Sequence, residues 1–177
     1  MPFGKKSIES SVATAVSEVG TTMGVIRAKS KFYATPAFPA GSGPDFINAA
    51  VAVETAMSPQ AFLAGLHGIE ASFGRDRSQR WGPRTLDLDL VAFDDLVHPD
   101  IDTYQKWAQL SLDEQMKRAP DGLILPHPRL AERAFVLVPL ADVAPEWRHP
   151  VTNVSVREML HALPEHLLAE VAAVRAA

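Results

Sequence analysis

The chain has 177 residues, 47% of them hydrophobic and 21% charged, which are ordinary values for a single globular domain with a real core. Its 17 basic and 21 acidic side chains give a net charge of -4, which argues against a nucleic-acid partner, and its lack of cysteine excludes disulfides, thiol nucleophiles and thiolate metal sites. The start lacks the apolar core of a signal peptide and no apolar run reaches the roughly 18 residues of a membrane span, so we expect a cytoplasmic protein with no membrane partner.

Helix and strand patterns alternate in the first half of the chain. Apolar residues recur at helical spacing before Gly20, and β-branched and aromatic residues dominate the segments that follow. Ser58 precedes Pro59, a pair that is typical of the N-cap and first turn of a helix. We predict a helix over 7–19, a strand over 25–33, a proline- and glycine-rich loop over 34–45, a strand over 46–55 and a helix over 58–73.

The second half is less regular. Polar and apolar residues nearly alternate over 85–92, which predicts a strand. Residues 100–121 are interpreted as an insertion in a single domain that covers 1–177. We predict a polar amphipathic helix over 104–118 with Trp107, Leu110 and Met116 on its apolar side, a short strand over 123–125, a helix over 129–140 that Pro139 disturbs, and two C-terminal helices over 155–163 and 164–175.

Charged residues are concentrated just before and within the predicted strand 85–92. There Asp87 and Asp89 would share one face, with Cα atoms roughly 7 Å apart, close enough to hold a hard cation or two ions bridged by phosphate oxygens. Guanidinium groups suit phosphate oxygens and stay charged at working pH, and four of them precede the aspartates: Arg75, Arg77, Arg80 and Arg84. The pattern predicts a polyphosphate ligand with magnesium, and the alternative is a solvated strand face.

The segment Arg80-Trp81-Gly82-Pro83-Arg84-Thr85-Leu86-Asp87-Leu88-Asp89-Leu90 resembles the signature of the 6-hydroxymethyl-7,8-dihydropterin pyrophosphokinase family of the folate pathway. The resemblance runs from about Gly4 to Leu160, and 100–121 is extra length relative to the shorter members. It implies transfer of diphosphate from ATP to the hydroxymethyl group of the pterin, with release of AMP, two Mg²⁺ ions and a monomeric enzyme with small-molecule substrates. The alternative is an N-terminally truncated form that binds ATP or pterin with little or no turnover.

The resemblance also assigns the nucleotide site. Asp87 and Asp89 would bind the metal, and His127, which stands between two prolines, would meet the transferred phosphates. His67 and Glu70 match positions that reach the nucleotide, although His67 replaces a familiar glutamine; alternatively they are a surface pair of little consequence. The implied catalytic residues are Arg75, Arg84, His127 and Arg133, and the implied ATP-binding residues are His67, Glu70, Arg77, Arg84, Leu90, His127 and Arg133.

A flat pterin ring requires aromatic faces and a few fixed hydrogen-bond partners. By the resemblance Phe46 and Phe135 would stack on the ring and Asn48 would bind its edge. The alternative for the aromatic residues is core packing. Asn48 inside an apolar strand favours a ligand, because a buried amide without partners costs roughly 1 to 3 kcal/mol. The implied pterin-binding residues are Thr35, Pro36, Phe38, Phe46, Asn48, Trp81 and Phe135.

The order of elements predicts an α+β fold, a ferredoxin-like α/β sandwich with helices packed on an antiparallel sheet that lacks its first strand. In the family this strand ends in Gly-Ser-Asn just before the first helix. Loss of an interior strand would leave backbone groups unpaired on a buried edge. We therefore expect Met1 to be an internal methionine of a longer product, or a misassigned start, with an apolar strand encoded upstream.

Overall fold

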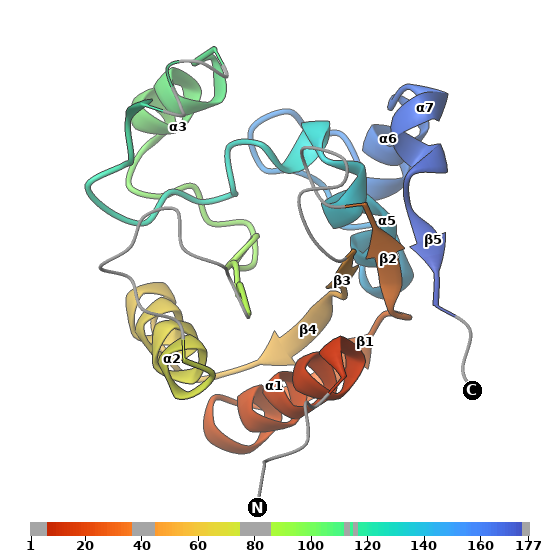
Figure 1. Cartoon of the computed structure of the whole chain (residues 1–177). Helices are drawn as coiled ribbons and strands as arrows, with labels where there is room; N and C mark the ends of the chain where they lie inside the picture. Colours follow the sequence, from red (N-terminus) through yellow and green to blue (C-terminus); the bar gives the residue numbers. More distant parts are fainter. Residues whose placement is uncertain (1–6, 37–44, 75–85, 112–113, 115–116, 175–177) are drawn as a thin grey trace, which may run out of the picture.

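The computed structural model describes residues 7–36, 45–74, 86–111, 114 and 117–174, and Figure 1 shows their arrangement. Helices and short antiparallel strands are mixed along the chain, so the predicted α+β class is confirmed. Within these ranges no helix is long and apolar enough to cross a membrane.

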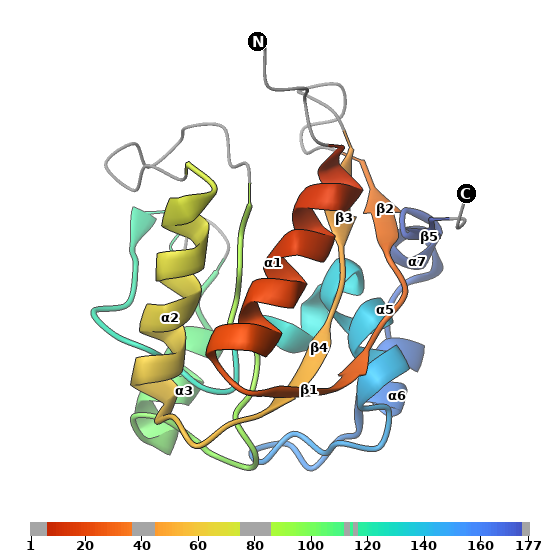
Figure 2. The same ribbon diagram turned by 90° about the horizontal axis from the view of Figure 1, so that it is seen from below.

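Helices α1 (Ile8–Thr22) and α2 (Pro59–Ser72) agree with the two predicted helices to within three residues. Each begins after a serine N-cap, whose hydroxyl accepts a hydrogen bond from a backbone N–H of the first turn. Such a cap contributes about 1 kcal/mol to helix stability. The two helices lie side by side in Figure 2. The side chains that face each other between them form part of a hydrophobic core.

The two strands predicted in the first half are each divided in the structure. Strand β1 (Val25–Lys29) pairs antiparallel with β4 (Val51–Glu54), and β2 (Tyr33–Thr35) pairs antiparallel with β3 (Phe46–Asn48). Between the two ladders the Ser30 N–H donates to the carbonyl of Ala50 at 2.9 Å, and the Ala50 N–H donates to Ser30 Oγ at 2.9 Å. Because a side chain takes the place of a backbone acceptor there, the regular ladder is interrupted.

The second half of the chain departs most from prediction at its helices and its tail. Pro139 lies inside helix α5 (Ala134–Val143) without ending it, because the helix is packed tightly and both Leu137 and Pro139 are buried. The tail predicted as one helix over 164–175 instead forms a short helix and then a strand that pairs with β2, where the ladder outweighs the helix preference of alanine. The elements are α3 (Ile101–Ala108), the 3-10 helix η1 (Leu130–Glu132), α5 (Ala134–Val143), α6 (Val156–His161), α7 (Glu165–Ala169) and β5 (Ala172–Ala173).

Predictions around residues 98–125 also need correction. Helix α3 begins three residues earlier than predicted because the Asp100 side chain caps it, accepting from the Thr103 N–H at 2.8 Å, and it ends at Ala108. The predicted strand 123–125 is reduced to an isolated antiparallel bridge between Leu125 and His98.

Helices cover both faces of the strands. Helix α1 contacts β1 and β3, and α5 contacts all of β1, β2, β3 and β4 from the opposite face (Figures 1 and 2). One hydrophobic cluster joins α1 and α2, and a second joins η1, α5 and α6. The buried members of the first are Ala15, Val19, Met23, Phe62, Leu66, Ile69 and Leu86, and those of the second are Leu130, Leu137, Val156 and Met159.

The run from Leu86 to Leu90, which we call the aspartate run, keeps the predicted alternation but pairs with no strand in the described part of the chain. Leu86 is buried in the first core and Leu88 and Leu90 pack against it, whereas Asp87 and Asp89 are exposed. Figure 2 shows the run extended beside α2. The two sheets that the structure describes have two and three strands, so the ferredoxin-like arrangement with its first strand missing stays a prediction.

Candidate active site

Glu70 on α2 fixes the aspartate run from inside the protein. Its side chain is fully buried, and its Oε1 accepts a hydrogen bond from the Leu88 N–H at 2.7 Å. Leu88 stands between Asp87 and Asp89, so this bond holds the backbone at the centre of the carboxylate pair. The alternative in which Glu70 belongs to a surface pair is therefore wrong. Its spacing of four residues from Leu66 placed Glu70 on the buried side of α2, a signal that the sequence analysis missed.

His127 is held in a defined orientation at the end of the same run. The backbone N–H of His127 donates to the carbonyl of Val91 at 2.8 Å. The ring Nδ1 of His127 accepts from the backbone N–H of Arg129 at 3.1 Å. Because Nδ1 is an acceptor, we assign the proton of the neutral ring to Nε2. Burial lowers the pKa of His127 from 6.5 to about 4, and the positive charges of Arg133 and Arg129 act in the same direction. At neutral pH the side chain is an uncharged Nε2–H donor.

This lowered pKa predicts a pH-dependent stability. Between about pH 6.5 and 4 the unfolded state binds the proton that folded His127 does not, so the free energy of unfolding falls as the pH falls through this window and levels off below it. One pKa unit corresponds to about 1.4 kcal/mol, so His127 contributes up to roughly 3 kcal/mol to this fall. Urea unfolding across the window should give a shallower fall for His127→Gln than for the wild type. Equal pH dependences would contradict the assignment.

Arg133 brings positive charge to the aspartate run. Its guanidinium lies over the ring of Phe135, 5.7 Å from the centroid. Burial lowers the pKa of Arg133 and Arg129 adds to this effect, whereas the carboxylates of Asp89, Glu132 and Asp87 raise it. Both aspartates therefore act electrostatically on Arg133. The two carboxylates and the guanidinium lie in the same region of the protein.

A pocket of about 280 Å³ lies where these groups meet. Four predicted nucleotide-site residues line it: Asp89 and Leu90 of the aspartate run, together with His127 and Arg133. They come from two segments about forty residues apart in the chain, which the fold brings together. In the described part of the chain, His67, Glu70 and Asp87 are not among its lining residues.

Most of the remaining pocket wall was not anticipated from the sequence. Leu63 of α2 contributes to it, as do Pro128 and Arg129 beside His127. The other residues come from the predicted insertion or directly follow it, a segment to which the sequence analysis gave no role. They are Trp107, Arg118, Pro120, Gly122, Leu123 and Ile124. The available signal was Trp107, because a tryptophan in a mostly polar helix indicates that this side of the helix contacts another part of the protein or a ligand.

Four predicted pterin-binding residues gather at the α5 side of β2 and β3. Thr35 and Phe46 are paired across the strands, and Asn48 Nδ2 donates to Thr35 Oγ1 at 2.9 Å, which gives the amide a partner without a ligand. Phe46 is 49% exposed, and Phe135 on α5 is 41% exposed. These exposures contradict the core-packing alternative for the two phenylalanines and leave their rings available to a ligand.

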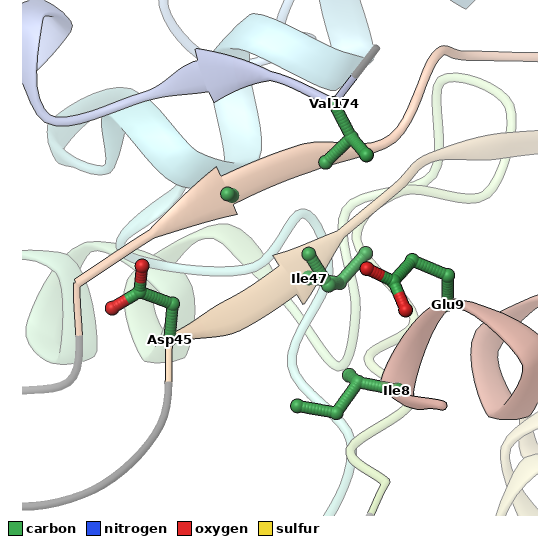
Figure 3. Close-up of a pocket in the computed structure, with 6 residues that line it drawn as sticks. Ile8, Glu9, Asp45, Ile47 and Val174 are labelled. Atoms are coloured by element: carbon green, nitrogen blue, oxygen red, sulfur yellow. The ribbon is translucent and has the colours of Figure 1, made fainter. Parts of the chain in front are cut away.

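A second cavity of about 560 Å³ lies near the start of α1, and none of the predicted site residues that the structure describes lines it (Figure 3). Its wall combines Ile8 and Glu9 of α1 with residues of the strands and Asp45. Among the described residues of this wall, the two charged side chains, Glu9 and Asp45, are acidic. Ile47 faces this cavity, so its neighbours Phe46 and Asn48 point to the opposite face of β3, toward α5.

Several predicted residues lie outside the described residues: Phe38, Arg75, Arg77, Trp81 and Arg84, together with Arg80 of the arginine run. Pro36 is described and exposed at the end of β2.

The described residues contain no group of three or more metal-ligating side chains. Two exposed carboxylates on the same side of an extended run still fit Mg²⁺, which usually takes one or two protein carboxylates and completes its shell with water and substrate phosphates. The donor set is therefore suited to a magnesium–polyphosphate complex.

An α+β fold whose pocket combines a carboxylate, a neutral histidine donor and a partly buried arginine has the features of a phosphotransferase. The model of the 7,8-dihydro-6-hydroxymethylpterin-pyrophosphokinase (HPPK) family matches residues 4–145. The chain belongs to this family.

Curated relatives agree with this membership. A protein of Synechocystis sp. is 35% identical over 147 residues, which are 82% of this chain and 65% of the relative. One of Methylorubrum extorquens is 39% identical over 153 residues, or 86% of this chain and 83% of the relative, and one of Pseudomonas aeruginosa is 40% identical over 107 residues, or 60% and 54%. All three are named 2-amino-4-hydroxy-6-hydroxymethyldihydropteridine pyrophosphokinase. The chain thus spans just under two thirds of the Synechocystis protein.

Proposed function

We propose that this chain transfers diphosphate from ATP to the hydroxymethyl group of 6-hydroxymethyl-7,8-dihydropterin, with release of AMP, in folate biosynthesis. The observation that carries the proposal is the meeting of Asp89, His127 and Arg133 in one pocket, in a chain of the HPPK family. The names of its relatives support the choice of substrate.

Four charged or polar residues have a chemical role in this reaction: Asp87, Asp89, His127 and Arg133. The Nε2–H of His127 donates to a phosphate oxygen, and a neutral donor does so without requiring a change of protonation at pH 7. Arg133 offsets charge on the phosphates, and its partial burial strengthens that interaction. Asp87 and Asp89 would hold Mg²⁺, which supplies further charge neutralisation when bound.

The reaction needs no covalent enzyme intermediate. The pterin hydroxyl oxygen loses its proton to water and forms a bond to the β-phosphorus of ATP, the bond from that phosphorus to the oxygen of the α-phosphate breaks, and AMP leaves with that oxygen. Phe46 and Phe135 offer ring faces for the pterin, and the Asn48–Thr35 pair offers hydrogen-bonding groups to its edge. The protein's main contribution is then to position the two substrates.

Two finer features belong to the same proposal. Two carboxylates separated by a single residue support a pair of Mg²⁺ ions bridged by phosphate. The antiparallel strands with α1 on one face and α5 on the other support a ferredoxin-like arrangement in which the aspartate run is a further strand.

The test is a product analysis with the purified 177-residue chain, ATP, MgCl₂ and the pterin alcohol. We expect AMP and pterin diphosphate in equal amounts, no AMP without pterin, and none after chelation of the metal by EDTA. Formation of ADP, or of AMP independently of pterin, would contradict the proposed reaction. A parallel calorimetric titration tests the alternative, a protein that binds ATP or pterin with little or no turnover. Such a protein would show heat of binding but form no AMP.

A further inference from the structure

The segment between His98 and Leu125, which we call the 98–125 loop, is anchored at both ends. His98 and Leu125 exchange two backbone hydrogen bonds, each 3.0 Å long, in an antiparallel bridge that holds the two ends of the loop together. The Gln60 side chain of α2 also contacts the His98 ring, at 3.2 Å between Nε2 atoms. The loop therefore begins and ends at one fixed point, next to the pocket residue Ile124.

Helix α3 inside the loop is fixed by a second contact. Tyr104 is buried, and its hydroxyl lies 2.8 Å from Nε2 of His149, itself a buried residue. Nδ1 of His149 accepts from the backbone N–H of Val151, which orients the ring. Trp107 follows Tyr104 by three residues, so it lies on the neighbouring part of the same helix face. This anchoring gives Trp107 a fixed position.

Among the six described residues that the loop contributes to the pocket of Asp89, His127 and Arg133, Trp107 and Arg118 have distinct chemistry. Trp107 is half-buried and presents a large flat ring, and Arg118 is exposed and cationic. Of the aromatic residues assigned to the pterin, the two that the structure describes, Phe46 and Phe135, do not line this pocket. A ring face that shares a pocket with the phosphate-binding groups therefore serves the nucleotide.

We infer that Trp107 and Arg118, two described residues of the 98–125 loop, form a nucleotide-recognition wall, in which Trp107 stacks on the base of ATP and Arg118 binds its phosphate chain. This inference rests on the proposed function for the identity of the nucleotide. Stacking between a base and an aromatic residue accounts for about 5- to 150-fold in affinity. A cation at the rim of the pocket gives a smaller contribution that weakens with added salt.

The test compares two probes that differ only in whether they carry a base and sugar. Calorimetry with MgCl₂ present would measure binding of ATP and of inorganic tripolyphosphate to the full chain. We expect Trp107→Ala to weaken ATP binding at least about tenfold and to leave tripolyphosphate binding within about twofold of wild type. Arg118→Ala should weaken binding of both probes. Trp107→Phe, which keeps an aromatic face, should restore most of the ATP affinity.

Lys106→Ala is the matched control, because Lys106 is an exposed cation on α3 that does not line the pocket. Its affinities for both probes should equal those of the wild type. Equal losses of ATP and tripolyphosphate affinity in Trp107→Ala, or no loss of either, would overturn the inference. If the wild type forms pterin diphosphate and Trp107→Ala binds ATP normally, the inference fails and the proposed function stands. If Trp107→Ala loses affinity for ATP but not for tripolyphosphate, and the wild type forms no AMP, the inference stands and the proposed function fails.

Discussion

Replacing Asp87 or Asp89 by asparagine should lower kcat for AMP release by about a thousandfold or more. Both carboxylates are exposed on one side of the aspartate run, and asparagine keeps their size while removing the charge that holds Mg²⁺. Metal stabilisation of phosphoryl transfer amounts to several kcal/mol, and each 1.4 kcal/mol is about a factor of ten in rate. Steady-state assays with saturating ATP and pterin would measure the loss.

The matched control for the aspartates is Asp95→Asn, since Asp95 is exposed a few residues beyond the run and does not line the pocket. It should retain wild-type turnover. Because Asp87 and Asp89 are exposed, neither asparagine variant should change the free energy of unfolding by more than about 0.5 kcal/mol. Retention of activity in a variant that carries both Asp87→Asn and Asp89→Asn would contradict the assignment of the metal site.

Replacing Glu70 by alanine should reduce the free energy of unfolding by about 2 to 4 kcal/mol. The change removes the acceptor of the Leu88 N–H and leaves a cavity at a fully buried position. Glu70→Gln keeps an oxygen that can accept this hydrogen bond and should lose less than half as much. Urea unfolding of the three proteins at pH 7 would give the values.

Glu70 should also affect catalysis through the aspartate run. Without the bond to Leu88 the positions of Asp87 and Asp89 are less well fixed, so Glu70→Ala should lower kcat about tenfold or more at a temperature where it remains folded. Leu66→Ala is the matched control, because it removes a buried side chain from the same helix at a similar cost in stability without touching this bond. An equal loss of activity in Leu66→Ala would show that Glu70 acts through stability alone.

Local signals determined much of this protein. Ser58 and Pro59 marked the start of α2 because capping and proline chemistry act within one turn. The alternation around Asp87 and Asp89 correctly gave which side chains are exposed, because side-chain direction in an extended chain has a period of two residues. The motif that contains them identified the family before any contact was known.

Long-range contacts decided the rest. The tail at Ala172 and Ala173 became a strand because the edge of β2 offered it a ladder, and no local propensity reports such an edge. Glu70 became the anchor of the aspartate run because α2 buries it next to Leu88, eighteen residues away. Trp107 came to line the pocket of Asp89, His127 and Arg133 because the His98–Leu125 bridge closes its loop. The energy of each arrangement lies in pairs of groups far apart in the chain, so only tertiary structure could determine it.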